Sequence, residues 1–71
     1  METKMRVQRR KTGTSGAAFA REIGMNPNVL TWVERGNAVL PAKWRSVVSA
    51  KLSIAEDELF DAKGFAREVN E

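Results

Sequence analysis

The chain lacks the two residue types that most often supply nucleophiles, bases and metal ligands. Cysteine and histidine are both absent, so the sequence excludes a disulfide framework, a thiolate nucleophile, a zinc finger and an imidazole base. The hydroxyl residues Thr12, Thr14 and Ser15 lie close together, but a hydroxyl needs an adjacent base to become a nucleophile. We therefore predict that the protein is not an enzyme and uses no cofactor.

Four carboxylates lie close together toward the C-terminus. Glu56, Asp57, Glu58 and Asp61 could hold a divalent cation, but their spacing does not match that of a calcium-binding loop. Carboxylates are favoured in the first turn of a helix because the helix dipole is positive at that end. We therefore interpret this cluster as the start of a helix and predict no metal site.

The basic residues are concentrated toward the N-terminus. The net charge is +3 and the isoelectric point is about 9.8. Residues 1–24 hold six basic and two acidic residues, whereas residues 46–71 hold three basic and six acidic ones. This asymmetry indicates a polyanionic partner on one side of the molecule. A solvated surface with chance asymmetry explains the charges alone equally well.

Composition and length indicate one small soluble domain. The 71 residues are 42% hydrophobic and 30% charged, a balance typical of globular domains. No apolar run approaches the roughly 18 residues that would indicate a membrane span, and no apolar stretch follows the charged N-terminus. We therefore expect a cytoplasmic protein with no membrane partner.

Glycine and proline divide the chain into segments of helical length. The first segment covers about residues 3–11. Ser15 is a suitable N-cap for a second helix, which Gly24 would end. Asn26 followed by Pro27 predicts the start of a third helix, because proline is favoured at the first helical position.

Two further helices are expected in the second half of the chain. Pro41 opens the fourth, which carries apolar residues at core spacing: Trp44, Val47, Val48 and Leu52. The acidic cluster begins a fifth. The sequence therefore predicts an all-α fold, a compact bundle of about five short helices.

The second and third helical segments are separated by only Gly24, Met25 and Asn26. Two helices across so short a glycine-containing turn are typical of a helix-turn-helix motif, whose second helix enters the DNA major groove. At about 100° per residue, Leu30 and Val33 share one side of the third segment. These two residues are therefore core candidates, and the opposite side is a candidate reading face.

Two stretches of sequence match the spacing of a known family. Residues Ala20–Gly36, AREIGMNPNVLTWVERG, contain an alanine, a glycine four residues later, the two apolar core candidates and a closing Glu34-Arg35-Gly36. Residues Ser53–Phe60, SIAEDELF, are similar to the family's closing helix. The chain thus resembles the Cro and phage-repressor helix-turn-helix proteins, often called XRE-like, over roughly residues 3–60. The resemblance implies a lambda-repressor-like bundle and binding to double-stranded DNA.

The outer side of the third helix is predicted to read bases through Asn28, Thr31 and Trp32. An asparagine can form a bidentate pair with adenine, and a threonine can touch a thymine methyl group. Large aromatic side chains are usually buried, so Trp32 could instead pack against the first helix. Contacts to the DNA backbone are predicted from a second set: Ser15, Gly16, Asn26, Arg35, Asn37, Lys43 and Arg45.

The resemblance also places an ion pair between Arg9 and Glu34. The first helix has few apolar residues, so a partly buried ion pair would help to fix its orientation against the end of the third helix.

We expect a DNA-binding domain over residues 1–62, followed by a tail over residues 63–71 that is either disordered or in contact with a dimer partner. A lone fifth helix could not cover Leu59, Phe60 and Phe65, so these residues predict a homodimer through the C-terminal third.

These features predict a small sequence-specific transcriptional regulator. It would be a Cro-like repressor of a phage or mobile element that binds palindromic operators as a dimer, with regulation by concentration or by a protein partner. The alternative is an antitoxin or antiactivator that retains the helix-turn-helix fold but binds a protein.

Overall fold

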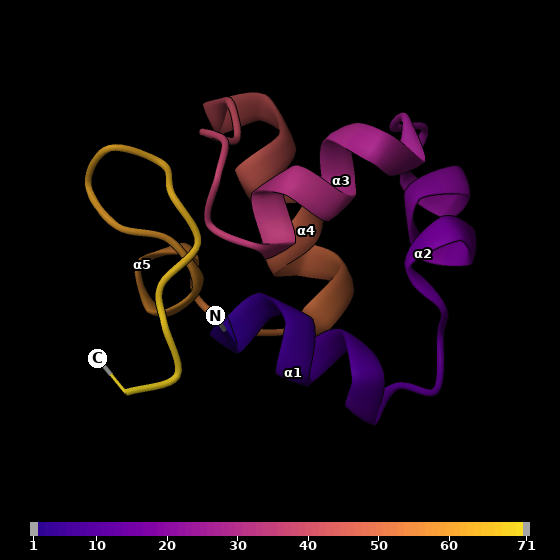
Figure 1. The fold of residues 1–71 in the computed structure, drawn as a ribbon, viewed down its shortest axis with the longest axis horizontal. Helices are drawn as coiled ribbons and strands as arrows, with labels where there is room; N and C mark the ends of the chain where they lie inside the picture. Colours follow the sequence, from indigo (N-terminus) through magenta and orange to yellow (C-terminus); the bar gives the residue numbers. More distant parts are fainter. Residues whose placement is uncertain (1, 71) are drawn as a thin grey trace.

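The computed structural model describes residues 2–70, which form five helices in a single bundle (Figure 1). In chain order these are α1 (Lys4–Lys11), α2 (Gly16–Ile23), α3 (Pro27–Glu34), α4 (Ala42–Leu52) and α5 (Glu56–Leu59). Over this part of the chain there is no strand, only isolated bridges that pair Thr3 with Glu68 and Phe60 with Ala66. The predicted all-α class is confirmed.

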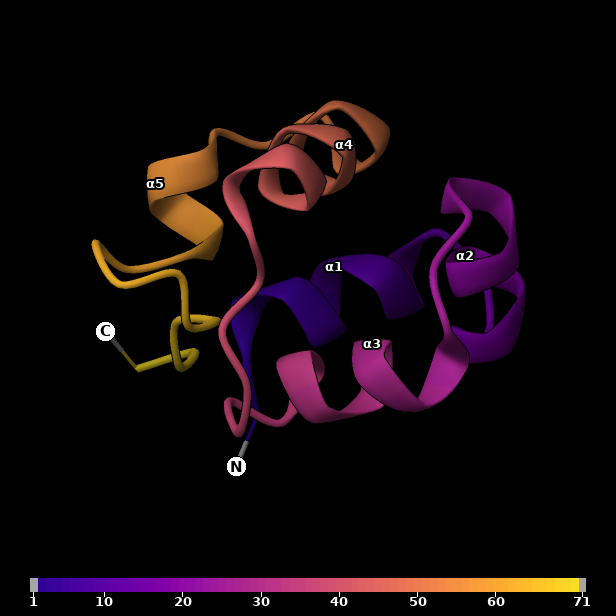
Figure 2. The same ribbon diagram turned by 90° about the horizontal axis from the view of Figure 1, so that it is seen from above.

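α3 and α4 lie on opposite faces of the bundle, as the view from above shows (Figure 2). α1 runs along the lower edge of the bundle in Figure 1. α2 lies at one end of the bundle, whereas α5 and the C-terminal segment lie at the other (Figures 1 and 2). The surface of α3 that points away from α1 is therefore not covered by another helix.

The first three helices begin where local residue types provide a cap. The side-chain oxygens of Thr3, Ser15 and Asn26 each accept a hydrogen bond from a backbone N–H in the first turn. α2 ends at Gly24, whose φ of 79° is accessible to glycine without strain. The Met25 N–H then donates to a carbonyl of the last turn of α2. These ends agree with those predicted from the sequence.

α4 ends without glycine. Ser53 follows the helix with a φ of 57°, and it is the only described residue other than glycine with a positive φ. The N–H of Ile54 donates to the carbonyl of Ser49 at 3.2 Å, and the Ser49 hydroxyl donates to the carbonyl of Ile54 at 2.5 Å. These two bonds hold the turn, while the backbone at Ser53 is strained.

Every helix contributes side chains to one hydrophobic core. The largest fully buried apolar side chains are Phe19, Met5, Leu30, Leu40, Leu59, Val33 and Val48. Burying a side chain of this size contributes about 1.5–3 kcal/mol. Trp44 and Leu52 pack partly buried against this core, whereas Val47, which was expected to join it, is 36% exposed. Val47 lies one residue before the buried Val48 and so faces outward.

The C-terminal segment returns across the bundle. The Leu40 N–H donates to the carbonyl of Gly64, and the Arg67 N–H donates to that of Leu59, both at 2.9 Å. At the start of α1, the Lys4 N–H donates to the Arg67 carbonyl at 2.9 Å. Residues 63–70 therefore pack on the bundle, and the boundary predicted after residue 62 has no structural counterpart in the part of the chain described.

Asp61 organises the turn that begins this return. Its Oδ1 accepts backbone N–H bonds from Lys63 (2.9 Å), Gly64 (2.9 Å) and Phe65 (3.0 Å). Desolvation by burial raises the pKa of Asp61, but these three donors and the positive charge of Arg67 outweigh it, so the pKa lies below its usual value. The ionised carboxylate is the form that holds the turn.

Candidate nucleic-acid interface

α2 and α3 meet across a short, tightly packed turn. Ala20 is fully buried and Met25, within the turn, is 9% exposed. The N–H of Met25 donates to the carbonyl of Ala20 at 2.8 Å. A small residue at the contact and a left-handed glycine before Met25 allow the two helices to approach closely. The turn thereby fixes the direction of α3.

The two sides of α3 differ sharply in exposure. Leu30 and Val33 are buried in the core, as expected, and Glu34 is buried beside them. The opposite surface, called here the outer face, consists of Asn28, Val29, Thr31, Trp32 and Arg35, all exposed. Trp32 is 55% exposed, so it lies on the outer face and not against α1. The structure thus brings together the three residues predicted to read bases.

The polar groups of the outer face differ in availability. Within residues 2–70, the side-chain amide of Asn28 makes no hydrogen bond, so both its donor and its acceptor are free. The Thr31 hydroxyl donates to the carbonyl of Pro27 at 2.9 Å, so its proton is used within α3 while its oxygen can still accept a hydrogen bond. Asn26 Oδ1 accepts from the N–H of Asn28 at 2.8 Å and so acts first as a cap.

Val29 belongs to the outer face although it is not among the residues predicted to read bases. It is 39% exposed. On a helical wheel it lies about 100° from Leu30 and about 60° from Trp32. That position is outside the side of α3 that carries the buried residues, so helical geometry could have identified Val29 as exposed. An isolated valine in an amphipathic helix is usually assigned to the core, which is why its exposure was not predicted.

A buried ion pair holds α1 to the end of α3. Arg9 donates from Nε to Glu34 Oε2 at 2.6 Å and from Nη2 to Glu34 Oε1 at 3.0 Å, the bidentate geometry of strong arginine–carboxylate pairs. Arg9 Nη1 also donates to the carbonyl of Thr14 at 2.8 Å. The buried Thr3 hydroxyl donates to the Glu34 carbonyl at 2.6 Å. The expected ion pair is present and positions α3.

A small basic hollow lies beside the outer face, where α2 begins. Its volume is about 100 Å³, and its lining comprises Arg6, Arg9, Gly16, Thr31, Glu34 and Arg35. Arg9 and Glu34 satisfy one another there, so Arg6 and Arg35 supply its net positive charge. Arg6 also lies 3.9 Å from a carboxylate oxygen of Glu2. The capped start of α2 at Ser15 adds backbone N–H groups that favour an anion.

The predicted backbone-contacting residues do not all lie near α3. Asn37 and Lys43 are exposed, and the Lys43 ammonium lies 5.4 Å from the centre of the Trp44 ring. Arg45 is half-buried, and its Nη1 donates to the carbonyl of Leu40 at 2.8 Å. Arg45 therefore serves the connection to the C-terminal segment, and its contact with the DNA backbone stays a prediction.

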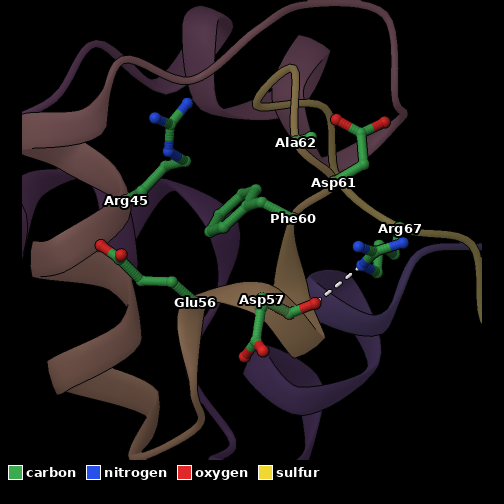
Figure 3. Close-up of a pocket in the computed structure, with 7 residues that line it drawn as sticks. All are labelled: Arg45, Glu56, Asp57, Phe60, Asp61, Ala62 and Arg67. Atoms are coloured by element: carbon green, nitrogen blue, oxygen red, sulfur yellow. Dashed lines mark hydrogen bonds between the residues drawn. The ribbon is translucent and has the colours of Figure 1, made fainter.

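A larger hollow lies at the α5 end, away from α2. It has a volume of about 530 Å³ and contains two arginines and three carboxylates around a central phenylalanine (Figure 3). Its lining residues are Arg45, Glu56, Asp57, Phe60, Asp61, Ala62 and Arg67. Arg67 donates from Nε to the carbonyl of Asp57 at 2.7 Å (Figure 3). Across residues 2–70, no group of three potential ligands is arranged to hold a metal.

The residues predicted to form the dimer surface are mostly internal. Leu59 is fully buried and Phe60 is 2% exposed, because the returning C-terminal segment covers them. This corrects the prediction that they would contact a partner. Phe65 is half-buried. The apolar surface that does remain there includes Val69, which is 44% exposed at one side of a groove between α1 and α5.

Comparisons with known proteins found no match to a protein-family model, a curated protein or a solved structure. None of the helices described is long and apolar enough to cross a membrane.

Proposed function

We propose that the protein is a small, cytoplasmic, sequence-specific regulator of transcription that binds double-stranded DNA. In this proposal α2, its turn and α3 act as a helix-turn-helix, and α3 lies in the major groove. Asn28, Thr31 and Trp32 read bases. The observation that carries the proposal is the outer face of α3, which no other element covers and which has a free amide at its N-terminal end.

Charge around this face supports the same function. The basic hollow beside α3 offers Arg6 and Arg35 with the N-terminus of α2, the combination that suits a phosphate group. Lys43 and Asn37 are exposed and remain candidate backbone contacts. Sequence-independent phosphate contacts of this kind supply much of the affinity of DNA-binding proteins.

A Cro-like repressor of a phage or mobile element, acting as a homodimer on palindromic operators, is the form of regulator that the family resemblance favours. Because Leu59 and Phe60 are internal, we place the dimer contact in the groove between α1 and α5. This groove has a volume of about 230 Å³ and is lined by Lys4, Val7, Gln8, Lys11, Ile54, Glu58, Leu59 and Val69. Its lysines and Glu58 can pair across a two-fold axis.

A salt titration of duplex binding tests the proposal. Fluorescence anisotropy of a labelled random-sequence duplex should show an affinity that falls steeply with salt, with a slope of about −0.9 per phosphate contacted. Lys43→Ala should make that slope shallower by about one. A weak affinity with no salt dependence would contradict DNA binding.

Binding to a protein is the second candidate. It is favoured by Trp32, since a 55% exposed tryptophan beside an exposed valine is a common centre of protein–protein interfaces. In that case Trp32→Ala would abolish capture of a protein partner, while duplex DNA would bind the wild type and the variant equally weakly.

A further inference from the structure

The outer face of α3 is unusually apolar for a surface that meets DNA. Val29 and Trp32 are 39% and 55% exposed, and residues three apart are neighbours on a helix surface. The Thr31 hydroxyl proton is already donated to the Pro27 carbonyl, so this side chain has no free donor for a base. The only charged residue of this face is Arg35, at the end of α3.

We infer that this surface recognises the 5-methyl group of a pyrimidine in the major groove, and that Val29 is a specificity-determining residue. The inference rests on the DNA-binding function proposed above. Base edges in the major groove consist almost entirely of hydrogen-bond donors and acceptors, and the thymine methyl is the apolar exception. An apolar side chain placed against a polar edge would desolvate it without compensation, so Val29 selects for the methyl.

Asn28 makes thymine the main source of that methyl. Its free amide can bond adenine in bidentate fashion, and it precedes Val29 by one residue. An adenine contact beside a methyl contact describes adjacent A·T pairs. A 5-methylcytosine presents the same methyl group but pairs with guanine, so it offers the apolar contact without the adenine.

The surroundings favour DNA over a protein as the occupant of this surface. Arg6 and Arg35 line the hollow next to it, and the carboxylate of Glu34 in that hollow is neutralised by Arg9. A polyanion is therefore complementary to the rim of the face, while a base edge with a methyl group is complementary to its centre.

The experiment uses the wild-type chain and two valine variants on one duplex. The duplex is the best binder selected from a random library, and each thymine is replaced in turn by deoxyuridine, which lacks only the 5-methyl group. Val29→Ala removes the proposed contact. Val47→Ala is the matched control, since Val47 is similarly exposed but lies on α4 and is not among the residues proposed to contact DNA.

Wild type and Val47→Ala should each lose about fourfold in affinity at one thymine of each half-site, the contribution of burying one methyl group. Val29→Ala should bind the thymine and deoxyuridine duplexes equally. A 5-methylcytosine·guanine pair at that site should recover the methyl contribution in wild type but not in Val29→Ala, and should still bind less tightly than thymine.

The inference is overturned if deoxyuridine costs nothing in wild type, or if it costs the same in Val29→Ala. Either result would be measured on a duplex that the wild type binds in a salt-dependent way. It would therefore contradict the methyl contact but not the proposed DNA binding. Failure of wild type to bind any duplex overturns the proposed function as well, and would assign the apolar surface to a protein partner.

Discussion

The buried pair of Arg9 and Glu34 makes Glu34→Gln the most informative change to stability. The Arg9 and Glu34 side chains are only 11% and 6% exposed, and two hydrogen bonds of 2.6 and 3.0 Å join them. Glutamine keeps the shape of Glu34 but removes its charge, which leaves the guanidinium buried without a counter-ion. Breaking a buried pair in this way costs about 3–5 kcal/mol.

A bundle of this size has little stability to lose. A core of fewer than about 80 residues rarely supplies more than ~3–5 kcal/mol, so Glu34→Gln should be largely unfolded in water. Urea denaturation followed by circular dichroism measures the free energy of unfolding of the wild type. The variant should show a helical circular dichroism spectrum only when a stabilising osmolyte is added.

The surface pair of Lys51 and Glu22 provides a control within the same chain. Its nitrogen–oxygen distance of 2.7 Å is as short, but the side chains are 34% and 49% exposed. Glu22→Gln should therefore cost only ~0–1 kcal/mol. The double change Arg9→Met with Glu34→Leu should restore most of the lost stability, because it leaves no unpaired buried charge. Equal costs for Glu34→Gln and Glu22→Gln would refute the reasoning.

Three further outcomes follow from local structure. Ser53→Gly should raise stability by about 0.5 kcal/mol, since relief of ~1–2 kcal/mol of left-handed strain is partly offset by chain entropy; an unchanged urea midpoint would contradict this. The pKa of Asp61 is lower in the folded protein than its value near 3.8 in the unfolded chain. Asp61 therefore stabilises the fold above that unfolded pKa, and the stabilisation is lost as the pH falls through the folded pKa. Asp61→Asn should make the free energy of unfolding depend less steeply on pH in the acid range. Arg45→Ala should lower the melting temperature because it removes the hydrogen bond to the Leu40 carbonyl, and it should leave the salt slope of DNA binding unchanged. A salt slope shallower by about one would instead show that Arg45 contacts a phosphate.

Local signals in the sequence predicted the helices well. Ser15, the Asn26-Pro27 pair and Gly24 act within a few residues of themselves, so their effect on helix ends does not depend on the rest of the fold. The outer position of Asn28, Thr31 and Trp32 followed from helical periodicity in the same way.

Contacts between segments distant in the sequence were harder to predict. Leu59 and Phe60 were expected on the surface because α5 alone could not cover them; residues 61–70, which have no helical or strand periodicity, do so by backbone hydrogen bonds to α1 and the α3–α4 connection. Arg45 was placed by charge and chain position, but its direction is set by a carbonyl at Leu40. Such contacts are properties of the assembled fold and leave no local pattern in the sequence.

The central claim, that the outer face of α3 reads base pairs, is tested most directly by parallel selection of random duplexes with the wild type and Asn28→Ala. The wild type should select a palindromic consensus that contains an adenine in each half-site. Asn28→Ala should bind that consensus about 1–3 kcal/mol more weakly and lose its preference at that adenine alone. An identical consensus bound with full affinity by Asn28→Ala, or no consensus from the wild type, would contradict the claim.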